Sequence, residues 1–483
     1  MRNGNGIAMP RLLLLLAEVI AFAVLARVAV AHFGTTDGLG ITVSYLIAYA
    51  VPRVILSRAR GTSMSACVLL FVVTVVLMAL DIKRLIDWTA LEGFSLERPN
   101  LTSDARYYYK WALYHFNGSV DCENVAFPGF PLIMLGLWKV FGLSTVWPQA
   151  MNLMFTLTSV VLTGMTTRRL LTGRVAASAR TLLLGGMAMV SIMIYYLVMG
   201  TAMLKEGSIS LTMTMAGYSL ASMAAIDEER HRPWRDFVVF VLACALMAFV
   251  RTTYLYFIAL GIVIMVLPHW RRDWIMATAM LAVFLVALLV GDHFASYSFE
   301  RHAEIVGGGW NMQRFYIKGD SQLIYRKVLD YYFLYSPWHR AFMLPMTMTV
   351  QFLIPLPWLY FEETYILNVL SRFTWGWYMV GGTALFYYIV MSWRRQACMG
   401  AWAWWPAVAF AVMAYVMAGS IARYVLPIEP LFVPVAMFVV CNLAEGRWRR
   451  PFKVWCIVFA LMLALALTVC FLFQRGYIDH LIS

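Results

Sequence analysis

The stretch TSDARYYYKWALYHF, residues 102–116, is a polar and aromatic segment that lies between two long apolar runs. The rest of the chain is far more apolar: of its 483 residues, 62% are hydrophobic and only 13% are charged, and the mean hydropathy is +0.73. The apolar stretches repeatedly reach about 17–25 residues, the length with which a helix crosses a hydrocarbon core. This contrast predicts an all-α polytopic membrane protein whose chemistry lies in the segments outside the lipid.

We interpret about thirteen segments as membrane-spanning helices, with the N-terminus inside and the C-terminus outside. They lie near residues 12–31, 41–57, 66–86, 149–167, 181–203, 207–225, 237–250, 252–267, 274–291, 375–392, 400–418, 424–443 and 453–473. The first is expected to be an uncleaved helix rather than a signal peptide, because further spans follow and no small-residue cleavage site is evident.

The formal net charge of +13 could indicate nucleic-acid binding, but the basic residues form short clusters beside the apolar runs. Such clusters are typical of the cytoplasmic ends of spans, so they indicate topology, and we expect no nucleic-acid partner. The clusters are Arg53, Arg58 and Arg60; Arg168, Arg169 and Arg174; His269, Arg271 and Arg272; Arg394 and Arg395; and Arg447, Arg449, Arg450 and Lys453. The cysteines and histidines lack disulfide-framework or metal-ligand spacing, so neither a metal nor a cofactor is expected.

Arg251 lies between two short apolar segments, 237–250 and 252–267. One long helix would place this arginine at mid-bilayer and move Arg271 and Arg272 outside, so we predict a hairpin with Arg251 at its outer end. The apolar segment 341–361 is interrupted by three prolines, and we interpret it as re-entrant or interfacial.

This topology divides the chain into five parts. They are the N-terminal transmembrane helices 1–86, a first large external loop with interfacial helices 87–148, a transmembrane core 149–291, an external loop with the re-entrant or interfacial segment 292–374, and the C-terminal transmembrane helices 375–483. Polar residues from separate parts of the chain therefore converge on the outer face, where a site at the lipid–water boundary is expected.

The external segment 104–116 contains neither Pro nor Gly, and Ser103 before it is a suitable N-cap, so a short interfacial helix is predicted. The helical period places the candidate site residues Asp104, Tyr107, Tyr108 and His115 on one face, together with Trp111. Asp104 is the candidate site carboxylate of this helix. The alternative is that Asp104 only accepts hydrogen bonds from the first-turn N–H groups while the tyrosines anchor the helix at the interface.

Further polar candidates lie at later outer turns. Lys205 and Glu206 separate two spans and are either part of the site or an ion pair at a tight turn. Arg251 and Arg423, the latter followed by Tyr424, each need an anionic partner, which is either a carboxylate or a lipid phosphate. Glu429 is a candidate partner for Arg423 or for a ligand.

Five short motifs follow one another in this order. They are Asp104-Ala105 with Tyr107 and Tyr108; Pro128 to Gly142; Lys205-Glu206; Arg251-Thr252; and Arg423-Tyr424 before Pro427. The order resembles that of the GT-C superfamily of membrane glycosyltransferases, particularly the bacterial relatives of protein O-mannosyltransferases and the lipid A aminoarabinose transferase. The likeness covers roughly residues 100–435. The chain departs from the family pattern in having two additional N-terminal helices before the large loop.

The resemblance implies a GT-C-like bundle in a bacterial inner membrane, with a polyprenyl-phosphate-linked sugar as donor and a glycan, lipid or protein as acceptor on the outer face. It implies that Asp104 deprotonates the acceptor hydroxyl and that Arg251, Arg423 and Lys205 bind the donor phosphate. Tyr107, Tyr108, Glu206, Tyr424 and His115 are the expected substrate contacts. An O-antigen or polysaccharide polymerase or ligase and a lipid-linked glycan transporter stay open as alternatives, because they use similar substrates.

Overall fold

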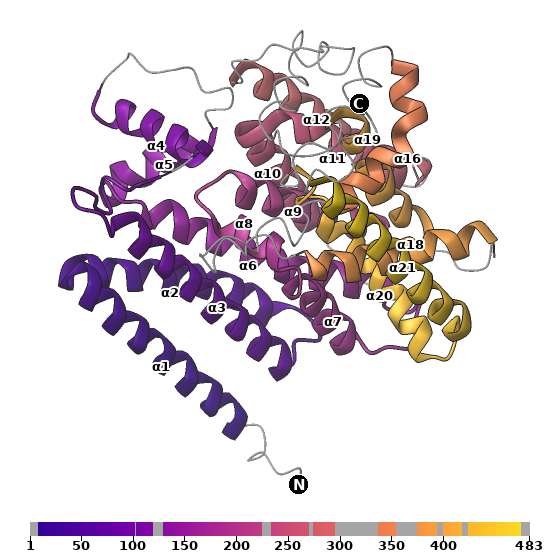
Figure 1. The fold of residues 1–483 in the computed structure, drawn as a ribbon, viewed down its shortest axis with the longest axis horizontal. Helices are drawn as coiled ribbons and strands as arrows, with labels where there is room; N and C mark the ends of the chain where they lie inside the picture. The colour runs from indigo at the N-terminus through magenta and orange to yellow at the C-terminus, as the bar shows by residue number, and fades with distance from the viewer. Residues whose placement is uncertain are drawn as a thin grey trace.

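The computed structural model describes residues 8–101, 103–118, 129–224, 233–269, 274–294, 337–353, 374–393, 399–417 and 424–474. Within these ranges the chain forms helices and no strand (Figure 1). The α-helices are α1 (Ala8–Phe33), α2 (Thr35–Arg58), α3 (Met64–Thr89), α4 (Ser103–Phe116), α5 (Gly129–Phe141), α6 (Val146–Leu171), α7 (Ala179–Ser191), α8 (Ile194–Thr201), α9 (Glu206–Ala224), α10 (Pro233–Arg251), α11 (Leu255–Gly261), α12 (Trp274–Phe294), α16 (Pro337–Leu353), α18 (Trp375–Trp393), α19 (Trp404–Met417), α20 (Glu429–Ala444) and α21 (Arg449–Gln474). Short turns of other helix types are η2 (Thr252–Tyr254), η3 (Ile262–Val266), η4 (Leu267–His269) and η6 (Gly400–Ala403).

Seven described helical runs are long and apolar enough to cross a membrane, or eight if α7 and α8 form one bent span. The seven are Met9–Phe33, Thr35–Arg58, Met64–Thr89, Val146–Leu171, Trp234–Val266, Trp274–Gly291 and Arg449–Thr468. The predicted all-α membrane class is therefore confirmed, whereas the count of about thirteen spans is not. Helices α9, α18, α19 and α20 lie where further spans are expected but do not meet the same criteria of length and apolarity.

The predicted span 181–203 is not one straight helix. It is broken after Ser191, where α7 and α8 meet at an angle of 73°. α8 ends at Thr201, and a short connection leads into α9. Where a helix ends inside a membrane bundle, lipid cannot bond its free backbone carbonyl groups, so partners within the protein are needed.

The chain folds back at Arg251, as the sequence predicts. Arg251 has an extended backbone (φ −164°, ψ 93°) that ends α10. Before this point, Met247 lies beside Thr212 of α9, with the Thr212 hydroxyl 3.5 Å from the Met247 sulfur. After it, Gly261 lies against Leu220, two turns further along α9. The run Trp234–Val266 thus consists of two arms that both pack on α9, although it counts as one candidate span by length and composition.

The predicted break at Pro345 is absent. α16 continues through this proline from Pro337 to Leu353, and the rest of the segment, 354–361, lies outside the described residues. Trp338 and Phe342 on α16 are 84% and 82% exposed. A proline interrupts only one backbone hydrogen bond when the carbonyl one turn earlier can find another donor or water, so an exposed helix tolerates it.

The basic clusters within the described residues lie at one end of the bundle, whereas Arg271, Arg272, Arg394 and Arg395 lie outside these residues. The Arg168 guanidinium donates to the Arg60 carbonyl, and the Arg174 guanidinium donates to the Met399 carbonyl at 2.6 Å. The C-terminal part of α9 lies at this basic end, because the Arg169 guanidinium is 5.3 Å from the ring centre of Tyr218. Glu206, the first residue of α9, lies at the other end of the helix. The predicted basic and catalytic segments are therefore separated along the helices.

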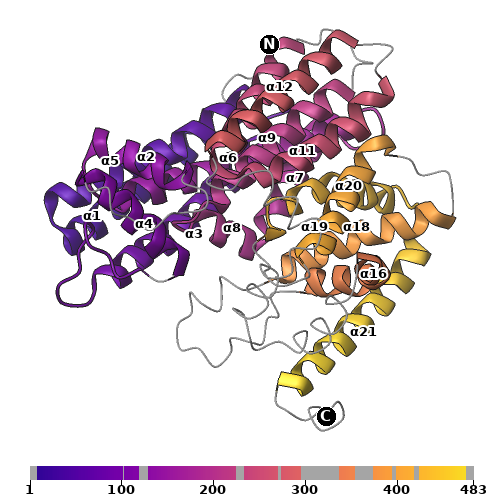
Figure 2. The same ribbon diagram turned by 90° about the horizontal axis from the view of Figure 1, so that it is seen from above.

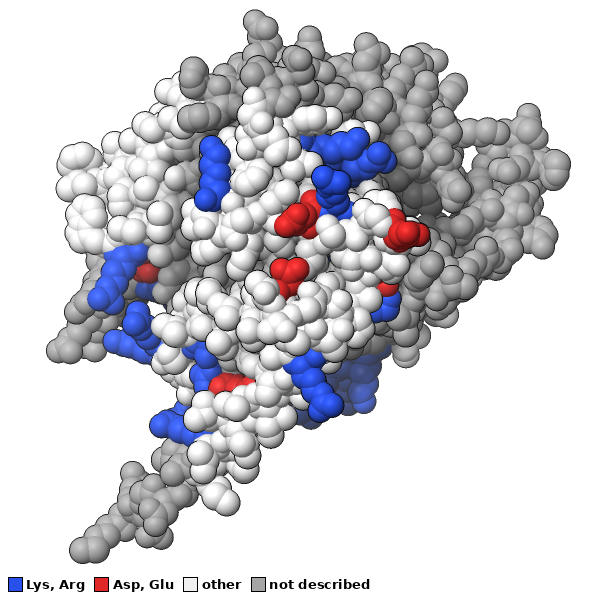
Figure 3. Space-filling view, turned by 90° about the vertical axis from the view of Figure 1, so that its left-hand side faces the viewer, with Lys and Arg blue, Asp and Glu red and all other residues white. Residues whose placement is uncertain are grey.

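The helices α6 and α9 form the centre, and α1 and α21 lie at the periphery (Figures 1 and 2). On the face over the N-terminal helices the described Lys and Arg side chains are scattered, with Asp and Glu between them, and the described residues there form no single continuous basic patch (Figure 3). This distribution agrees with basic clusters placed at the ends of helices.

Candidate active site

Helix α4 packs against α5 through aromatic side chains. Tyr108 meets Phe130 edge to face at 5.7 Å between ring centres, and Tyr109 meets Trp138 at 5.1 Å. The Tyr109 hydroxyl donates to the Glu97 carbonyl, and burial raises the pKa of this phenol. These contacts fix α4 over the start of α5.

The predicted shared face of α4 is only partly correct. Asp104 is half-buried in the first turn and Tyr108 is 5% exposed, but Tyr107 is 57% exposed and points away from the packed side. The buried side instead includes Tyr109, which the helical-face prediction left out. The packed stripe of α4 is therefore offset by about one residue from the helix face that carries the predicted site residues.

His115 lies at the far end of α4 from Asp104. Its ring stacks on Trp111 at 3.8 Å, and its Nδ1 is 3.0 Å from the Trp111 carbonyl oxygen. Eleven helical residues separate it from Asp104, or roughly 16 Å at 1.5 Å per residue. The structure thus does not bring these two predicted site residues together.

Lys205 and Tyr108, both predicted site residues, do meet. The Lys205 ammonium donates to the Tyr108 hydroxyl at 2.7 Å and lies 5.3 Å from the centre of that ring. Lys205 is 8% exposed and Glu206, which begins α9, is 2% exposed. A cation and a carboxylate are thus both buried at the turn between α8 and α9.

This turn is held by buried polar side chains on α6. The Asn152 amide donates to the carbonyls of Ala202 at 2.5 Å and Leu204 at 2.8 Å. Gly207 allows a close approach, because a Cβ atom there would lie 2.4 Å from the Gly200 carbonyl oxygen. The turn that carries Lys205 therefore has little freedom to move relative to α6.

A second support comes from α3. The Arg84 guanidinium donates to the Val198 carbonyl at 2.8 Å, to the Thr201 hydroxyl at 2.9 Å and to the fully buried Asp81 carboxylate at 2.9 Å. It thus supplies a donor to a carbonyl of the broken helix. The sequence prediction missed this pair, although two opposite charges three residues apart inside the predicted span 66–86 are a signal of buried pairing.

Arg251 lies between two aromatic rings. Its guanidinium carbon is 4.6 Å from the ring centre of Tyr424 and 5.6 Å from that of Tyr254. The Tyr254 hydroxyl donates to the Tyr424 carbonyl at 2.7 Å and so connects the two segments. The structure brings the predicted Arg251 and Tyr424 together and adds Tyr254, whereas Arg423 lies outside the described residues.

Glu429, the candidate partner of Arg423, is the first residue of α20 and is 5% exposed. It lies close enough to Tyr196 of α8 to interact with it electrostatically. The Glu429 carboxylate therefore lies on the side of the bundle that faces α8, the second half of the broken helix.

The start of α5 joins the Lys205 and Arg251 groups. Gly129 lies so close to α10 that a Cβ atom would be 1.9 Å from the Phe249 carbonyl oxygen. Its neighbour Phe130 is fully buried against Tyr108. Contacts therefore run without a gap from Lys205 to the end of α10, two residues before Arg251.

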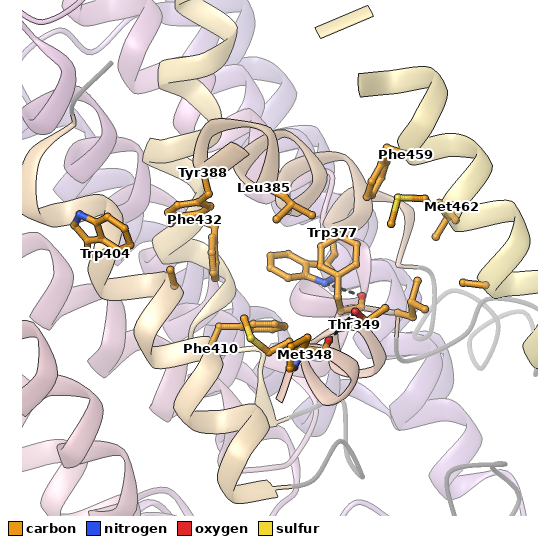
Figure 4. A pocket seen from close by; sticks show the side chains of 17 residues that line it. Met348, Thr349, Trp377, Leu385, Tyr388, Trp404, Phe410, Phe432, Phe459 and Met462 are labelled. Atoms are coloured by element: carbon orange, nitrogen blue, oxygen red, sulfur yellow. Dashed lines mark hydrogen bonds between the residues drawn. The ribbon is translucent and has the colours of Figure 1, made fainter. Parts of the chain in front are cut away.

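An apolar pocket of about 470 Å³ lies in the C-terminal part of the bundle, between α16, α18, α19, α20 and α21 (Figure 4). Aromatic and aliphatic side chains point into it from all sides; its lining includes Met348, Trp377, Leu385, Phe410, Phe432 and Phe459. Phe432 lies on the same segment as Tyr424, a few turns further into the bundle. The volume of this pocket is within the range of cavities that bind small organic ligands.

Within the described part of the chain, no group of three or more His, Cys, Asp or Glu side chains is arranged to hold a metal ion. Comparisons with protein-family models, curated proteins and solved structures give no match for this chain. Its functional assignment therefore depends on the site itself and on the order of its motifs.

Proposed function

We propose that this protein is a membrane glycosyltransferase that moves a sugar from a polyprenyl-phosphate donor to a hydroxyl of a glycan, lipid or protein acceptor. The observation that carries the proposal is the set of contacts from Lys205 and Tyr108 through the start of α5 to Phe249, two residues before Arg251, which itself lies against the Tyr424 ring. Buried cations beside aromatic rings suit a ligand that combines a phosphate with an apolar chain and a sugar ring.

In the proposed reaction Asp104 accepts the proton of the acceptor hydroxyl. The hydroxyl oxygen forms a bond to the anomeric carbon, and the bond from that carbon to the phosphate oxygen breaks with inversion. The electron pair leaves on polyprenyl phosphate, whose growing charge is stabilised by Arg251, Arg423 and Lys205. Because the leaving group is already a stable phosphate anion, the site needs a base and cations rather than a protein nucleophile.

The remaining predicted contacts divide between the two substrates. Tyr108 orients Lys205 through its hydroxyl, and Tyr424 stacks on Arg251, so both act beside the donor phosphate. Glu206 lies beside Lys205 at the same turn and is suited to accept hydrogen bonds from sugar hydroxyls. The exposed Tyr107 and the stacked His115 lie along α4 toward the acceptor side.

The apolar pocket supports a prenyl chain as part of the donor. The phosphate would bind at Arg251 and the chain would follow α20 from Tyr424 past Phe432 into the pocket. A prenyl chain in the pocket would make van der Waals contacts with its aromatic and aliphatic lining, so the pocket would increase donor affinity without touching the reacting atoms.

The test follows the fate of the bond between sugar and phosphate. Membranes that contain or lack the protein are supplied with polyprenyl-phosphate-linked sugars extracted from the host, and both products are measured by mass spectrometry. We expect free polyprenyl phosphate to accumulate only with the protein, and not with Asp104→Asn or Arg251→Gln. Unchanged lipid-linked sugar in the presence of folded protein would contradict the proposal.

A transporter is the second candidate, and one observation favours it: α7 and α8 form a broken helix over the buried Asp81–Arg84 pair, as in many secondary transporters. The same assay separates the two functions, because transport moves the lipid-linked sugar across the membrane and leaves its phosphate bond intact. A polymerase or ligase also breaks the bond to the phosphate, but it transfers a preassembled glycan chain and not a single sugar. The mass of the glycosylated product therefore distinguishes it from the proposed transferase.

We further propose an inner-membrane location with this site on the outer face, since the basic clusters lie at the other end of the bundle. In a background without native cysteines, Lys110→Cys should react with an impermeant thiol reagent from outside. Arg450→Cys should react only after the membrane is permeabilised. The opposite labelling would reverse the orientation.

A further inference from the structure

A second pocket, of about 960 Å³, lies at the basic end of the N-terminal helices, between α1, α2, α3 and the start of α7. It is far from the candidate active site, because α3 begins beside it and ends at the segment that leads to α4. The 26 residues of α3 span roughly 39 Å at 1.5 Å per residue, more than the thickness of a hydrocarbon core. The pocket and the candidate active site therefore face opposite sides of the membrane.

The floor of this pocket is a satisfied charge cluster. Arg53 on α2 places its Nε 3.3 Å from the Glu18 carboxylate and its guanidinium 3.1 Å from the Cys67 sulfur. The Tyr49 hydroxyl also donates to Glu18 at 2.5 Å. Glu18 is the only carboxylate among the lining residues, and it is already bound to two donors.

The rim carries two more arginines on different elements. Arg11 comes from the first turn of α1 and Arg180 from the first turn of α7, and both are exposed. Among the salt bridges of the described residues, none involves either of them. With Arg53 neutralised by Glu18, the pocket keeps two further cations, which come from two different helices.

Apolar side chains continue from this rim along α1. Leu14 and Leu15 line the pocket, while Leu12 and Leu16 on the same helix are 62% and 53% exposed to the surroundings. α1 is also one of the helices least covered by the rest of the chain, with 17% of its most apolar stretch buried. A ligand here would meet cations at its head and an open apolar helix surface along its tail.

We propose that this pocket binds the phosphodiester headgroup of an anionic phospholipid, with Arg11 and Arg180 on the phosphate and an acyl chain along α1. Guanidinium groups bind phosphate oxygens through paired hydrogen bonds, and basic pockets between membrane helices are suited to anionic headgroups. A zwitterionic lipid supplies the phosphate but adds a cation that the two arginines repel. This site acts in the leaflet opposite the proposed transfer reaction and does not depend on that reaction.

The test measures the thermal unfolding midpoint of the purified full chain in detergent while phosphatidylglycerol is added. We expect a saturable rise, no comparable rise with phosphatidylcholine of the same chains, and none with inorganic phosphate. In Arg11→Gln, Arg180→Gln the concentration for half the effect should increase about tenfold or more, the loss expected for hydrogen bonds to charged groups. Arg450→Gln, Lys453→Gln removes two exposed charges from α21 and should respond like the wild type.

Three results would overturn the proposal. A wild-type response in the Arg11→Gln, Arg180→Gln protein would remove these arginines from the site. Equal shifts with both lipids would indicate only apolar adsorption, and an equal shift with inorganic phosphate would indicate a free-anion site. Native mass spectrometry of the wild type gives a check without variants: equal retention of phosphatidylglycerol and phosphatidylcholine would also contradict the proposal.

Discussion

The broken-helix region around α8 and the pocket region around α18 are built in opposite ways. At α8 a helix ends inside the bundle, and its carbonyls are bound by Arg84 and Asn152. Around α18 the helices are continuous, and the side chains that face the 470 Å³ pocket are almost all apolar. At the end of α8 buried polar side chains therefore satisfy the free carbonyls and also fix the turn that carries Lys205. Regular backbone leaves space that only an apolar ligand fills.

The largest expected effect concerns the polar region and the proposed base. Asp104→Asn should lower sugar transfer by about 10²–10⁴-fold, the usual contribution of a general base, while expression and thermal unfolding stay near wild type. Turnover of purified protein measures this. Glu92→Gln removes an exposed acid from the same external segment and should leave turnover unchanged. Near wild-type turnover of Asp104→Asn would exclude it as the base.

The second prediction tests whether the buried pair supports the broken helix. Asp81→Asn leaves Arg84 without its carboxylate partner, so we expect the free energy of unfolding to fall by about 3 kcal/mol. Denaturant titration of the purified protein measures this change. The control lies on the same helix: the Lys83–Asp87 pair is exposed, with 49% and 37% of its side chains accessible. Asp87→Asn should cost no more than about 0.5 kcal/mol. Equal effects of the two substitutions would mean that burial of the first pair has no consequence.

The sequence predicts the helical class, the fold-back at Arg251 and the separation of the basic clusters, because apolar length and charge at helix ends depend on the local chain alone. It does not predict the break after Ser191, since that segment is largely apolar, nor the bonding of the end of α8, whose donors Arg84 and Asn152 come from other helices. For the same reason Tyr254 was missed: its contact with Tyr424 joins segments 170 residues apart.

The third prediction tests the apolar region. Leu385→Trp places a larger side chain in the pocket and should weaken binding of decaprenyl phosphate about tenfold, because the larger ring occupies space that the chain would fill. Binding of a short isoprenyl phosphate, measured by the same calorimetric titration, should not change. Leu461→Trp is the matched control, since Leu461 is 65% exposed on α21 and does not line the pocket. Equal weakening for both chain lengths would mean that the pocket does not hold the chain.

The smallest expected effect separates geometry from charge at Arg251. Arg251→Lys keeps the cation but loses the planar group that lies 4.6 Å from the Tyr424 ring, so we expect about fivefold weaker binding of decaprenyl phosphate, equivalent to about 1 kcal/mol. Tyr424→Leu removes the ring and should give a similar loss, whereas Tyr424→Phe keeps it and should bind like the wild type.

Combining Arg251→Lys with Tyr424→Leu decides whether the two residues act as one unit. If the ring acts by holding the guanidinium, the double variant should lose little more than either single variant, because the first substitution already removes the contact. Additive losses would mean that Arg251 and Tyr424 contact the ligand independently. A wild-type affinity of Arg251→Lys would show that charge alone suffices at this position. The polar region would then contribute a cation to binding, but not the planar geometry of a guanidinium against a ring.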